Sequence, residues 1–490
     1  MTDDRKPIAN PLVVLREEFD DWAILFDPDT GNAFGLNPVG VFVWKLLDGE
    51  HAVVDIVREI KGGMEDVSPE AHSHIDLFVQ DLIKQGLAGY EIQTPMNAGM
   101  MEPSFHLSSI PSFRPFPREG EAMNVMKTPK SVDIEITTRC NLRCKYCSHF
   151  TSAGDVGKDL PTGEWLTFFE ELGRCAVMDV TLCGGEPFIR GDFKQIIEGV
   201  VRNRMRFKIL SNGTLITDEM AAFLASTKRC DSVQVSIDGS VPVTHDVCRG
   251  RGAFSKAMNG IRHLQKYNLP VTVRVTIHRK NVHDLENVAR LLLEDVGLPG
   301  FSTNSASHLG LCRKNAEMVQ LTVGERVLAM ETLLRLTDTY NGRISAAAGP
   351  LAEGRGWLEM EEARKEGREM SGRGFLVGCG GPMSTLGVRA DGMIVACGQM
   401  PHMSLGRMNK DNLKEIWQNH PELNRFRERR SIPLADFEFC RGCDYVNYCT
   451  GSCPALAYTI TGNPYHPAPD ACLRKFIEEG GRLPQLDRRA

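Results

Sequence analysis

The chain has 490 residues, of which 42% are hydrophobic and 7% aromatic, and its formal net charge at pH 7 is -6. This length allows roughly two to four domains with full-sized cores. The acidic balance gives no general attraction to nucleic acid or to anionic membranes, so we expect neither as a partner. The amino terminus lacks an apolar signal core and no segment is long enough to span a bilayer, which predicts a cytoplasmic protein. In that compartment the 15 cysteines indicate metal binding rather than disulfides.

Residues 12–92 are expected to form a small first unit. Apolar alternation separated by turn residues predicts three strands, around residues 13–15, 23–25 and 34–36. Helical periodicity then predicts three helices, over residues 41–47, 53–60 and 71–85. Three strands followed by three helices predict a winged-helix-like α+β domain within residues 1–95.

The next segment, residues 96–129, contains Pro, Met, Ser and Arg in irregular order and is expected to be a linker. Beyond it, apolar alternation returns in five segments separated by helix-length stretches, near residues 132–136, 180–182, 207–209, 233–237 and 271–277. Repeated strand-helix units imply parallel strands with right-handed crossovers, which predicts an α/β barrel or partial barrel. The polar motifs follow the strands, at the carboxyl end of the sheet where barrel enzymes assemble active sites.

Cys140, Cys144 and Cys147 stand in a C-x3-C-x2-C run directly after the first of these strands. Thiolates so close together cannot all pair as disulfides, but they can hold three irons of a cubane cluster and leave the fourth iron open. A structural zinc site is the alternative, although zinc prefers four ligands in paired C-x2-C knuckles.

With Tyr146 before its last cysteine, this run resembles the cluster-binding loop of the radical S-adenosylmethionine (SAM) superfamily. The resemblance implies a partial (β/α)6 TIM-like barrel over residues 130–340, in which the three cysteines hold the catalytic [4Fe-4S] cluster. It also implies reductive cleavage of SAM to a 5'-deoxyadenosyl radical that abstracts hydrogen from a substrate. A flavodoxin- or ferredoxin-like electron donor is the implied partner.

Later motifs follow the family's order, and the resemblance assigns them to SAM contact: Gly184, Gly185, Glu186, Pro187, Ser211, Asn212, Ser236, Asp238 and Arg249. Paired glycines allow close approach of backbone to a ligand, and the Glu186 carboxylate could stabilise an ammonium group. Taken singly, each motif is equally compatible with a tight turn or a helix cap, and Arg249 with a surface ion pair.

A second group of cysteines lies in residues 373–490, after a connection expected over residues 341–372. It consists of Cys379, Cys397, Cys440, Cys443, Cys449, Cys453 and Cys472. The pattern resembles a SPASM domain with two auxiliary [4Fe-4S] clusters, and two zinc sites are the alternative.

By resemblance to the SPASM family, the auxiliary cysteines fall into two sets. Cys379, Cys397 and Cys453 would bind the first cluster, and the other four would bind the second. The first cluster lacks a fourth cysteine in this pattern, and Cys312 is a candidate to close it.

The first unit resembles PqqD-like recognition elements of ribosomally made, post-translationally modified peptides, which bind a leader segment as an added strand. DNA binding is the alternative for a winged-helix shape, but the unit lacks a basic recognition helix. The whole chain is therefore expected to be a radical SAM/SPASM peptide maturase that binds a precursor peptide and forms a thioether or carbon-carbon crosslink.

Three alternatives stay open for the function. One is a peptide epimerase, and another is a non-catalytic iron-sulfur peptide adaptor. The third is modification of a protein Ser or Cys as in sulfatase-maturing enzymes, which carry Asp after the cysteine matching Cys397, where this chain has Gly398.

Overall fold

The computed structural model describes residues 5–63, 70–90, 125–148, 158–377 and 379–485. Two compact units are present, one formed mainly by residues 1–127 and the other by most of residues 128–490. Most of the predicted linker, residues 96–129, lies outside the described residues. No helix in the described ranges is long and apolar enough to cross a membrane.

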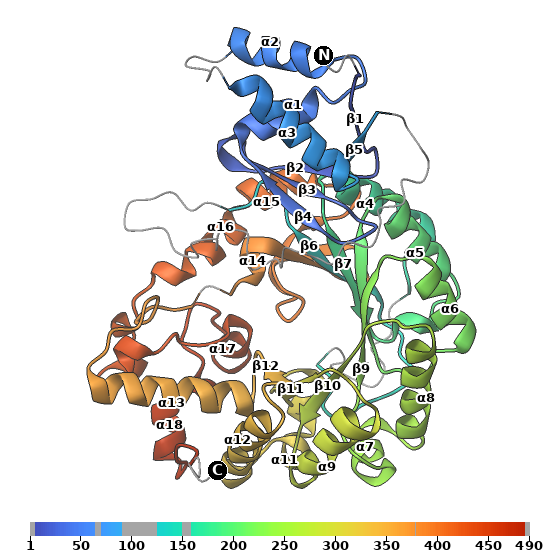
Figure 1. Ribbon diagram of the computed structural model, residues 1–490. Helices are drawn as coiled ribbons and strands as arrows, with labels where there is room; N and C mark the ends of the chain where they lie inside the picture. The colour runs from blue at the N-terminus through green and yellow to red at the C-terminus, as the bar shows by residue number, and fades with distance from the viewer. Residues whose placement is uncertain (1–4, 64–69, 91–124, 149–157, 378, 486–490) are drawn as a thin grey trace. The chain divides into compact units, whose positions relative to one another are not determined.

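The first unit is a three-stranded antiparallel sheet followed by three helices (Figure 1). The strands, in sheet order, are β2 (Val14–Glu17), β3 (Ala23–Phe26) and β4 (Ala33–Leu36). The helices are α1 (Pro38–Lys45), α2 (Val53–Gly63) and α3 (Ala71–Lys84). The predicted order of three strands and three helices is confirmed. Sequence analysis missed a two-residue antiparallel pair, β1 (Ile8–Ala9) with β5 (Ala88–Gly89), which is too short to show alternation.

The second unit is built on a ten-stranded sheet in the order β12-β11-β10-β9-β8-β7-β6-β13-β14-β15. Its first seven strands in chain order are β6 (Ser131–Thr137), β7 (Asp179–Gly184), β8 (Arg206–Ser211), β9 (Cys230–Ser236), β10 (Val271–Ile277), β11 (Phe301–Ser305) and β12 (Ile344–Ala346). β6 pairs in parallel with β7, and the pairs from β8 to β12 are parallel as well. The partial parallel barrel that the sequence predicted is confirmed.

Helices α4 (Thr162–Arg174), α5 (Phe193–Arg202), α6 (Asp218–Ser226) and α8 (Ala253–Lys266) lie outside the curved sheet in Figure 1. The other helices in this part of the chain are α7 (Pro242–Arg249), α9 (Leu285–Arg290), α10 (Gly310–Lys314), α11 (Ala316–Val319), α12 (Val323–Thr339) and α13 (Pro350–Glu366). β12 and α13 both fall within residues 341–372, where sequence analysis expected only a connection.

The last segment extends the sheet at its β6 edge. β13 (Thr385–Val388) pairs in parallel with β6, and the antiparallel strands β14 (Met393–Val395) and β15 (Ser404–Arg407) follow. Short helices complete this segment: α14 (Gly381–Ser384), α15 (Leu413–Asn419), α16 (Pro421–Glu428), α17 (Pro454–Thr461) and α18 (Leu473–Glu478). The predicted domain boundaries themselves remain predictions.

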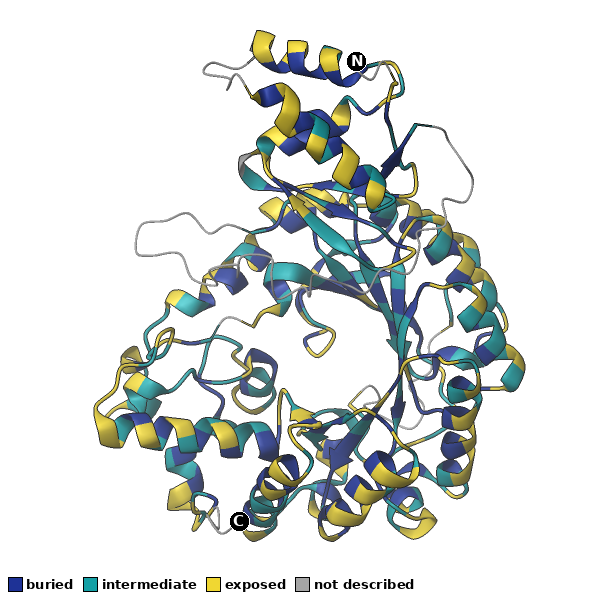
Figure 2. Ribbon diagram, viewed as in Figure 1, coloured by how far each residue is buried: buried dark blue, intermediate teal, exposed yellow. Residues whose placement is uncertain are grey.

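Alternating side chains divide the barrel strands into two faces. Val132, Ile134 and Ile136 of β6 are fully buried, as expected for the face that packs against helices. Figure 2 shows buried and partly buried residues along the strands of this sheet. The residues between them, Asp133 and Glu135, are polar and lie on the inner face of the sheet. The inner face is therefore polar, unlike the apolar packed interior of a closed barrel.

Candidate active site and cluster ligands

Cys140, Cys144 and Cys147 lie together in the loop that follows β6. The Cys147 amide donates to the Cys144 carbonyl oxygen at 3.1 Å, which closes a turn. Burial raises the pKa of Cys144 to about 12, and the thiols of Cys147 and Cys140 also raise it. Three thiols that affect one another in this way fit the ligand set of one iron-sulfur cluster, which would bind them as thiolates and release their protons.

The next strand, β7, ends in a turn that requires glycine. A Cβ atom on Gly184, whose φ is +122°, would lie 2.3 Å from the Thr137 carbonyl oxygen, and one on Gly185 would lie 2.1 Å from the Arg139 carbonyl oxygen. Both contacts are far closer than atoms can approach. The glycines therefore let the β7 turn pack directly against the start of the cysteine loop.

Glu186 follows these glycines and is fully buried. Its carboxylate accepts hydrogen bonds from the Ser211 hydroxyl at 2.8 Å and from the Asn212 amide at 2.7 Å. Burial raises the pKa of Glu186 to about 7, although these hydrogen bonds act in the opposite direction. Arg249 also lowers this pKa, but the described residues form no ion pair with Glu186, and such a buried carboxylate can accommodate an ammonium group from a ligand.

Asn212 connects the turn after β8 to the cysteine loop. Its side-chain amide lies 3.8 Å from the Cys140 sulfur and donates to the Asn141 Oδ1 at 2.9 Å. Asn212 thus contacts both Glu186 and the predicted cluster ligand Cys140.

Asp238 and Arg249 form a buried ion pair, with Arg249 Nε 2.5 Å from Asp238 Oδ2. The Tyr146 hydroxyl donates to the same carboxylate, and the Thr276 amide donates to Asp238 Oδ1 at 2.9 Å. Burial alone would raise the pKa of Asp238, but Arg249 and the other groups around the carboxylate together hold the pKa below its ordinary value. Arg249 is only 7% exposed, so the alternative of a surface ion pair is wrong.

Ser236 ends β9 as a half-buried residue, and Pro187 is buried in the turn after Glu186. The structure thus brings the predicted motifs to the carboxyl ends of successive strands, β6 to β9. Their individual roles in SAM contact remain predictions.

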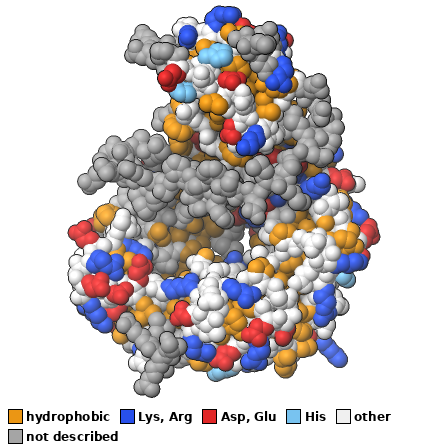
Figure 3. All heavy atoms as spheres, viewed as in Figure 1, with side chains coloured by type: hydrophobic (Ala, Val, Ile, Leu, Met, Phe, Trp, Pro, Cys, Tyr) orange, Lys and Arg blue, Asp and Glu red, His pale blue; other side chains and the backbone are white. Residues whose placement is uncertain are grey.

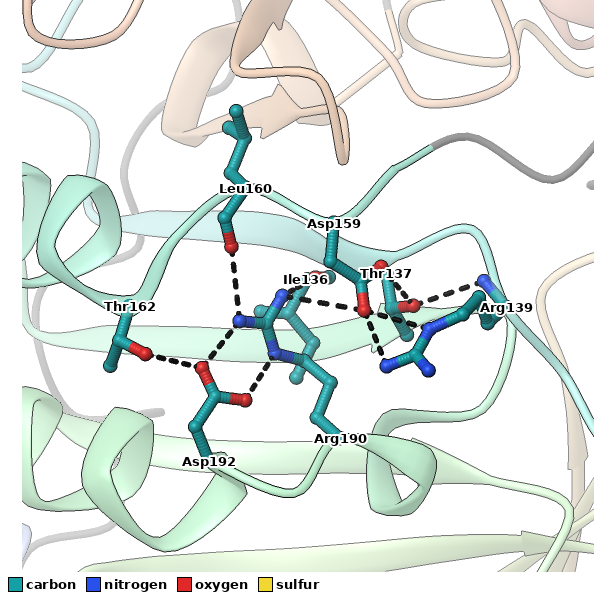
Figure 4. A network of polar contacts seen from close by, with 8 residues as sticks. All are labelled: Ile136, Thr137, Arg139, Asp159, Leu160, Thr162, Arg190 and Asp192. Atoms are coloured by element: carbon teal, nitrogen blue, oxygen red, sulfur yellow. Dashed lines mark hydrogen bonds and ion pairs between the residues drawn. The ribbon is translucent and has the colours of Figure 1, made fainter.

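A further buried network holds the base of the cysteine loop, and Figure 4 shows its members. Arg190 Nη1 donates to the Ile136 carbonyl oxygen at 2.8 Å, while Arg190 Nη2 and Asp192 are paired at 2.6 Å. Asp159 accepts from the Thr137 hydroxyl at 2.6 Å and also pairs with Arg139. Sequence analysis missed this network because its members are far apart in the chain and belong to no recognised motif.

Four of the carboxyl-terminal cysteines line one cavity: Cys440, Cys443, Cys449 and Cys472. Burial raises the pKa of Cys440 to about 12, and the other three thiols raise it further. In the described part of the chain, no three His, Cys, Asp or Glu side chains are close enough together to hold a single metal ion. Four mutually interacting thiols around a cavity nevertheless fit the ligand set predicted for the second auxiliary cluster.

Cys379, Cys397 and Cys453 form the other set. Burial raises the pKa of Cys397 to about 11, and the thiols of Cys379 and Cys453 contribute to the shift. Cys312, the candidate fourth ligand, lies elsewhere, in a buried cluster with Cys248 and Val319. Burial and the Asp470 carboxylate raise its pKa to about 11, without a contribution from the three thiols. The structure therefore gives no support to Cys312 as a ligand of this cluster.

Comparison with known families identifies three domains along the chain. The sequence matches the family models of coenzyme PQQ synthesis protein D (PqqD) over residues 23–88, the Radical SAM superfamily over residues 134–292, and the SPASM iron-sulfur cluster-binding domain over residues 379–444. These ranges contain β3 to α3 of the first unit, most of the barrel, and four of the seven carboxyl-terminal cysteines.

Two curated relatives show similar levels of identity. PqqA peptide cyclase of Ruegeria pomeroyi is 26% identical over 363 residues, which cover 70% of this chain and 88% of the relative. AdoMet-dependent heme synthase of Methanosarcina barkeri is 26% identical over 341 residues, which cover 68% of this chain and 94% of the relative.

Structures of Streptococcus suis SuiB share the fold over nearly the whole chain. The SAM-bound structure has a TM-score of 0.60 and 14% identity, and the match covers 95% of this chain and 100% of SuiB. The structure bound to the precursor peptide SuiA has a TM-score of 0.58 and 13% identity, with 94% and 100% covered.

Proposed function

We propose that this chain, a radical SAM enzyme with a PqqD domain before its barrel and a SPASM domain after it, crosslinks a ribosomally made precursor peptide. The observation that carries the proposal is the convergence of the three-cysteine loop, Glu186 and Asn212 in a chain that also has a peptide-recognition domain. The similarity to PqqA peptide cyclase, and the SuiB fold seen with a precursor peptide, support the same substrate class.

A [4Fe-4S] cluster held by Cys140, Cys144 and Cys147 would supply the electron that cleaves SAM to the hydrogen-abstracting radical. The protein supplies binding and orientation. Glu186 is largely ionised above about pH 7 and would pair with the SAM ammonium group. Asn212 fixes the position of Cys140 relative to Glu186, and the Asp238–Arg249 pair orders the turn after β9.

Crosslinking removes two hydrogens from the peptide. The SAM-derived radical takes one hydrogen atom, a new bond forms at the resulting carbon radical, and one further electron and one proton must leave. An auxiliary cluster in the SPASM domain is the acceptor we propose for that electron. Epimerisation instead returns a hydrogen atom to the α carbon and needs no electron acceptor, so two auxiliary clusters favour crosslinking.

A flavodoxin- or ferredoxin-like protein is the electron donor that we propose, and the cytosol is the compartment. Arg143 and Lys145 are exposed on the cysteine loop and would complement an acidic donor protein. The described cysteines all carry free thiols, in keeping with a reducing compartment.

Other functions are less well supported. Gly398 takes the place of the Asp that the sulfatase-maturing enzymes carry, so modification of a protein Ser or Cys lacks its proposed base. Similarity to a heme synthase would favour a non-peptide substrate, but a peptide-recognition domain has no evident use there. A non-catalytic adaptor would have no need for Glu186 and Asn212 next to the cysteine loop.

Cleavage of SAM tests the enzymatic part of the proposal. Reduced, cluster-loaded protein should convert SAM to 5'-deoxyadenosine and methionine, and Cys144→Ala should abolish this conversion. Cys175→Ala is the matched control because Cys175 follows α4, outside the predicted ligand sets. Retained cleavage in Cys144→Ala would contradict the assignment.

A further inference from the structure

We infer that Arg274, on the inner face of the barrel, binds a carboxylate of the core peptide and thereby selects which residue of that peptide lies beside SAM. The inference rests on the proposed function. It goes further by defining the substrate as a peptide with an acidic side chain or a free carboxyl terminus at the modified segment.

Arg274 lies in the middle of β10 and shares a face with polar neighbours. It pairs in register with Ser236 of β9 and Ser302 of β11, and paired residues of parallel strands point to the same side of a sheet. The flanking residues Val273 and Val275 are fully buried on the opposite face. Arg274 therefore points toward the interior of the barrel unit, which is hollowed at its centre in Figure 3.

The Arg274 guanidinium has one hydrogen-bond partner in the described residues, since its Nε donates to Gln234 Oε1 at 3.1 Å. No carboxylate of the described residues pairs with it, and burial is the only cause that lowers its pKa. The side chain is half-buried, and in the described residues its two terminal nitrogens donate to no group. Gln234 thus fixes one edge of the guanidinium and leaves the two-nitrogen fork that binds carboxylates.

Two fully buried arginines in this unit are held differently from the half-buried Arg274. Arg427 donates to the carbonyl oxygens of Pro382 and Trp417, and Arg429 donates to those of Pro464 and Val377. Backbone carbonyl oxygens thus hold both guanidinium groups in place, although Arg427 Nη2 is buried without a partner in the described residues. The inner-face cation Lys208 is also paired, with Asp179 at 3.3 Å.

The peptide is a better source of the carboxylate than SAM is. Glu186, Asn212 and Cys140, which would receive the amino-acid end of SAM, lie after β6, β7 and β8. Adjacent strands are about 4.8 Å apart, so β10 lies roughly 10 Å along the sheet from β8. Ser236 lies on β9, between β8 and β10, and is paired with Arg274. A carboxylate bound at Arg274 would therefore be separated from SAM by about the width of this strand.

The test uses the full-length, cluster-loaded enzyme and the peptide that anaerobic co-expression identifies as modified. Three enzyme variants are compared: Arg274→Gln removes the charge, Arg274→Lys keeps the charge without the fork, and Arg262→Gln is an exposed control on α8. In the peptide, each core Asp or Glu is replaced by its amide in turn, and a further version is amidated at its carboxyl terminus.

Arg274→Gln should lower kcat/KM for the peptide by roughly tenfold to a hundredfold, as expected when a charged hydrogen-bonding partner is lost. Cleavage of SAM without peptide should be unchanged, and Arg274→Lys should recover part of the loss. One of the amidated peptides should show the same loss of kcat/KM with the wild-type enzyme, and combining it with Arg274→Gln should cause no further loss. The position of the amide in that peptide shows whether Arg274 binds an acidic side chain or the carboxyl terminus.

Two results would overturn the inference while leaving the proposed function intact. Loss of SAM cleavage in Arg274→Gln would show that Arg274 binds the carboxylate of SAM. If the losses in kcat/KM from Arg274→Gln and from the peptide substitution add up when they are combined, Arg274 does not bind that peptide carboxylate. If the wild-type enzyme modifies no peptide, the proposed function and this inference fall together.

Discussion

Glu186 and Asp238 are both fully buried carboxylates, but their pKa values move in opposite directions. Burial dominates at Glu186 and raises its pKa to about 7. At Asp238 burial acts in the same direction, but the Arg249 guanidinium and the other groups around the carboxylate together lower the pKa. Glu186 is therefore the carboxylate still available to a cationic ligand, and Asp238 is a positioning group.

Replacing Glu186 by Gln should weaken SAM binding at pH 8 by roughly tenfold or more, because an amide cannot neutralise an ammonium group. The amide oxygen can still accept from the Asn212 backbone amide, and the amide NH2 can donate to the Ser211 hydroxyl, so the fold should persist. Equilibrium binding of SAM to cluster-loaded protein measures the effect. Glu164→Gln, at an exposed position of α4, is the control; unchanged affinity in Glu186→Gln would refute the role.

Buried histidines predict a loss of stability in mild acid. Burial lowers the pKa of His278 to about 4, below its ordinary value of 6.5. The folded protein then binds fewer protons than the unfolded chain between these values, so stability is full above pH 6.5 and falls as the pH drops toward 4.

His278 alone contributes about 3 kcal/mol across this whole pH interval. His278→Gln should therefore reduce the difference in unfolding free energy between pH 7 and pH 5, as measured by denaturant titration. The exposed His74→Gln should leave it unchanged. An equal pH dependence in wild type and His278→Gln would show that His278 is not the cause.

Among the elements, the turn after β7 and the cysteine loop depend most directly on each other. Gly185→Ala would place a methyl group 2.1 Å from the Arg139 carbonyl oxygen, so the cysteine loop must shift. We expect a loss of about 1–3 kcal/mol of stability together with reduced iron content. Gly163→Ala in α4 is the matched control, since a Cβ there meets no atom within 4 Å. Normal iron content in Gly185→Ala would contradict the packing described for this turn.

Strands with clear alternation could be predicted from sequence. β6 to β10 carry apolar residues at every second position and were all expected. β11 reads Phe-Ser-Thr-Asn-Ser and β12 has three residues, so neither shows the period of a half-buried strand. Their pairing with β10 depends on contacts between distant segments, which local periodicity does not record.

At the scale of the whole molecule, the predicted cluster ligands have different functions: the three-cysteine loop is needed for SAM cleavage, and the carboxyl-terminal cysteines hold the auxiliary clusters. Cys443→Ala should lower the iron content by about four atoms per chain because it removes a ligand of one predicted [4Fe-4S] cluster. Cleavage of SAM by dithionite-reduced protein should persist, since the three-cysteine loop is untouched. Iron analysis and a SAM cleavage assay check this prediction. Loss of nearly all iron together with loss of SAM cleavage would contradict it and would indicate that the variant does not fold.

The site was predictable where it is encoded by spacing and hidden where it depends on long-range packing. Cys140, Cys144 and Cys147 lie seven residues apart from first to last, so the loop is visible in the sequence. The contacts of Arg190 with Ile136 and of Asp238 with Arg249 and Tyr146 join different strand ends. No local pattern marks such pairs, which require the folded barrel.

Anaerobic co-expression of the protein with each short open reading frame encoded beside its gene tests the central claim most directly. The account predicts that one peptide becomes about 2 Da lighter, through loss of two hydrogens, and that Cys144→Ala leaves the mass of that peptide unchanged. An unchanged mass for every peptide, from protein that carries its clusters and cleaves SAM, would contradict peptide crosslinking as the function.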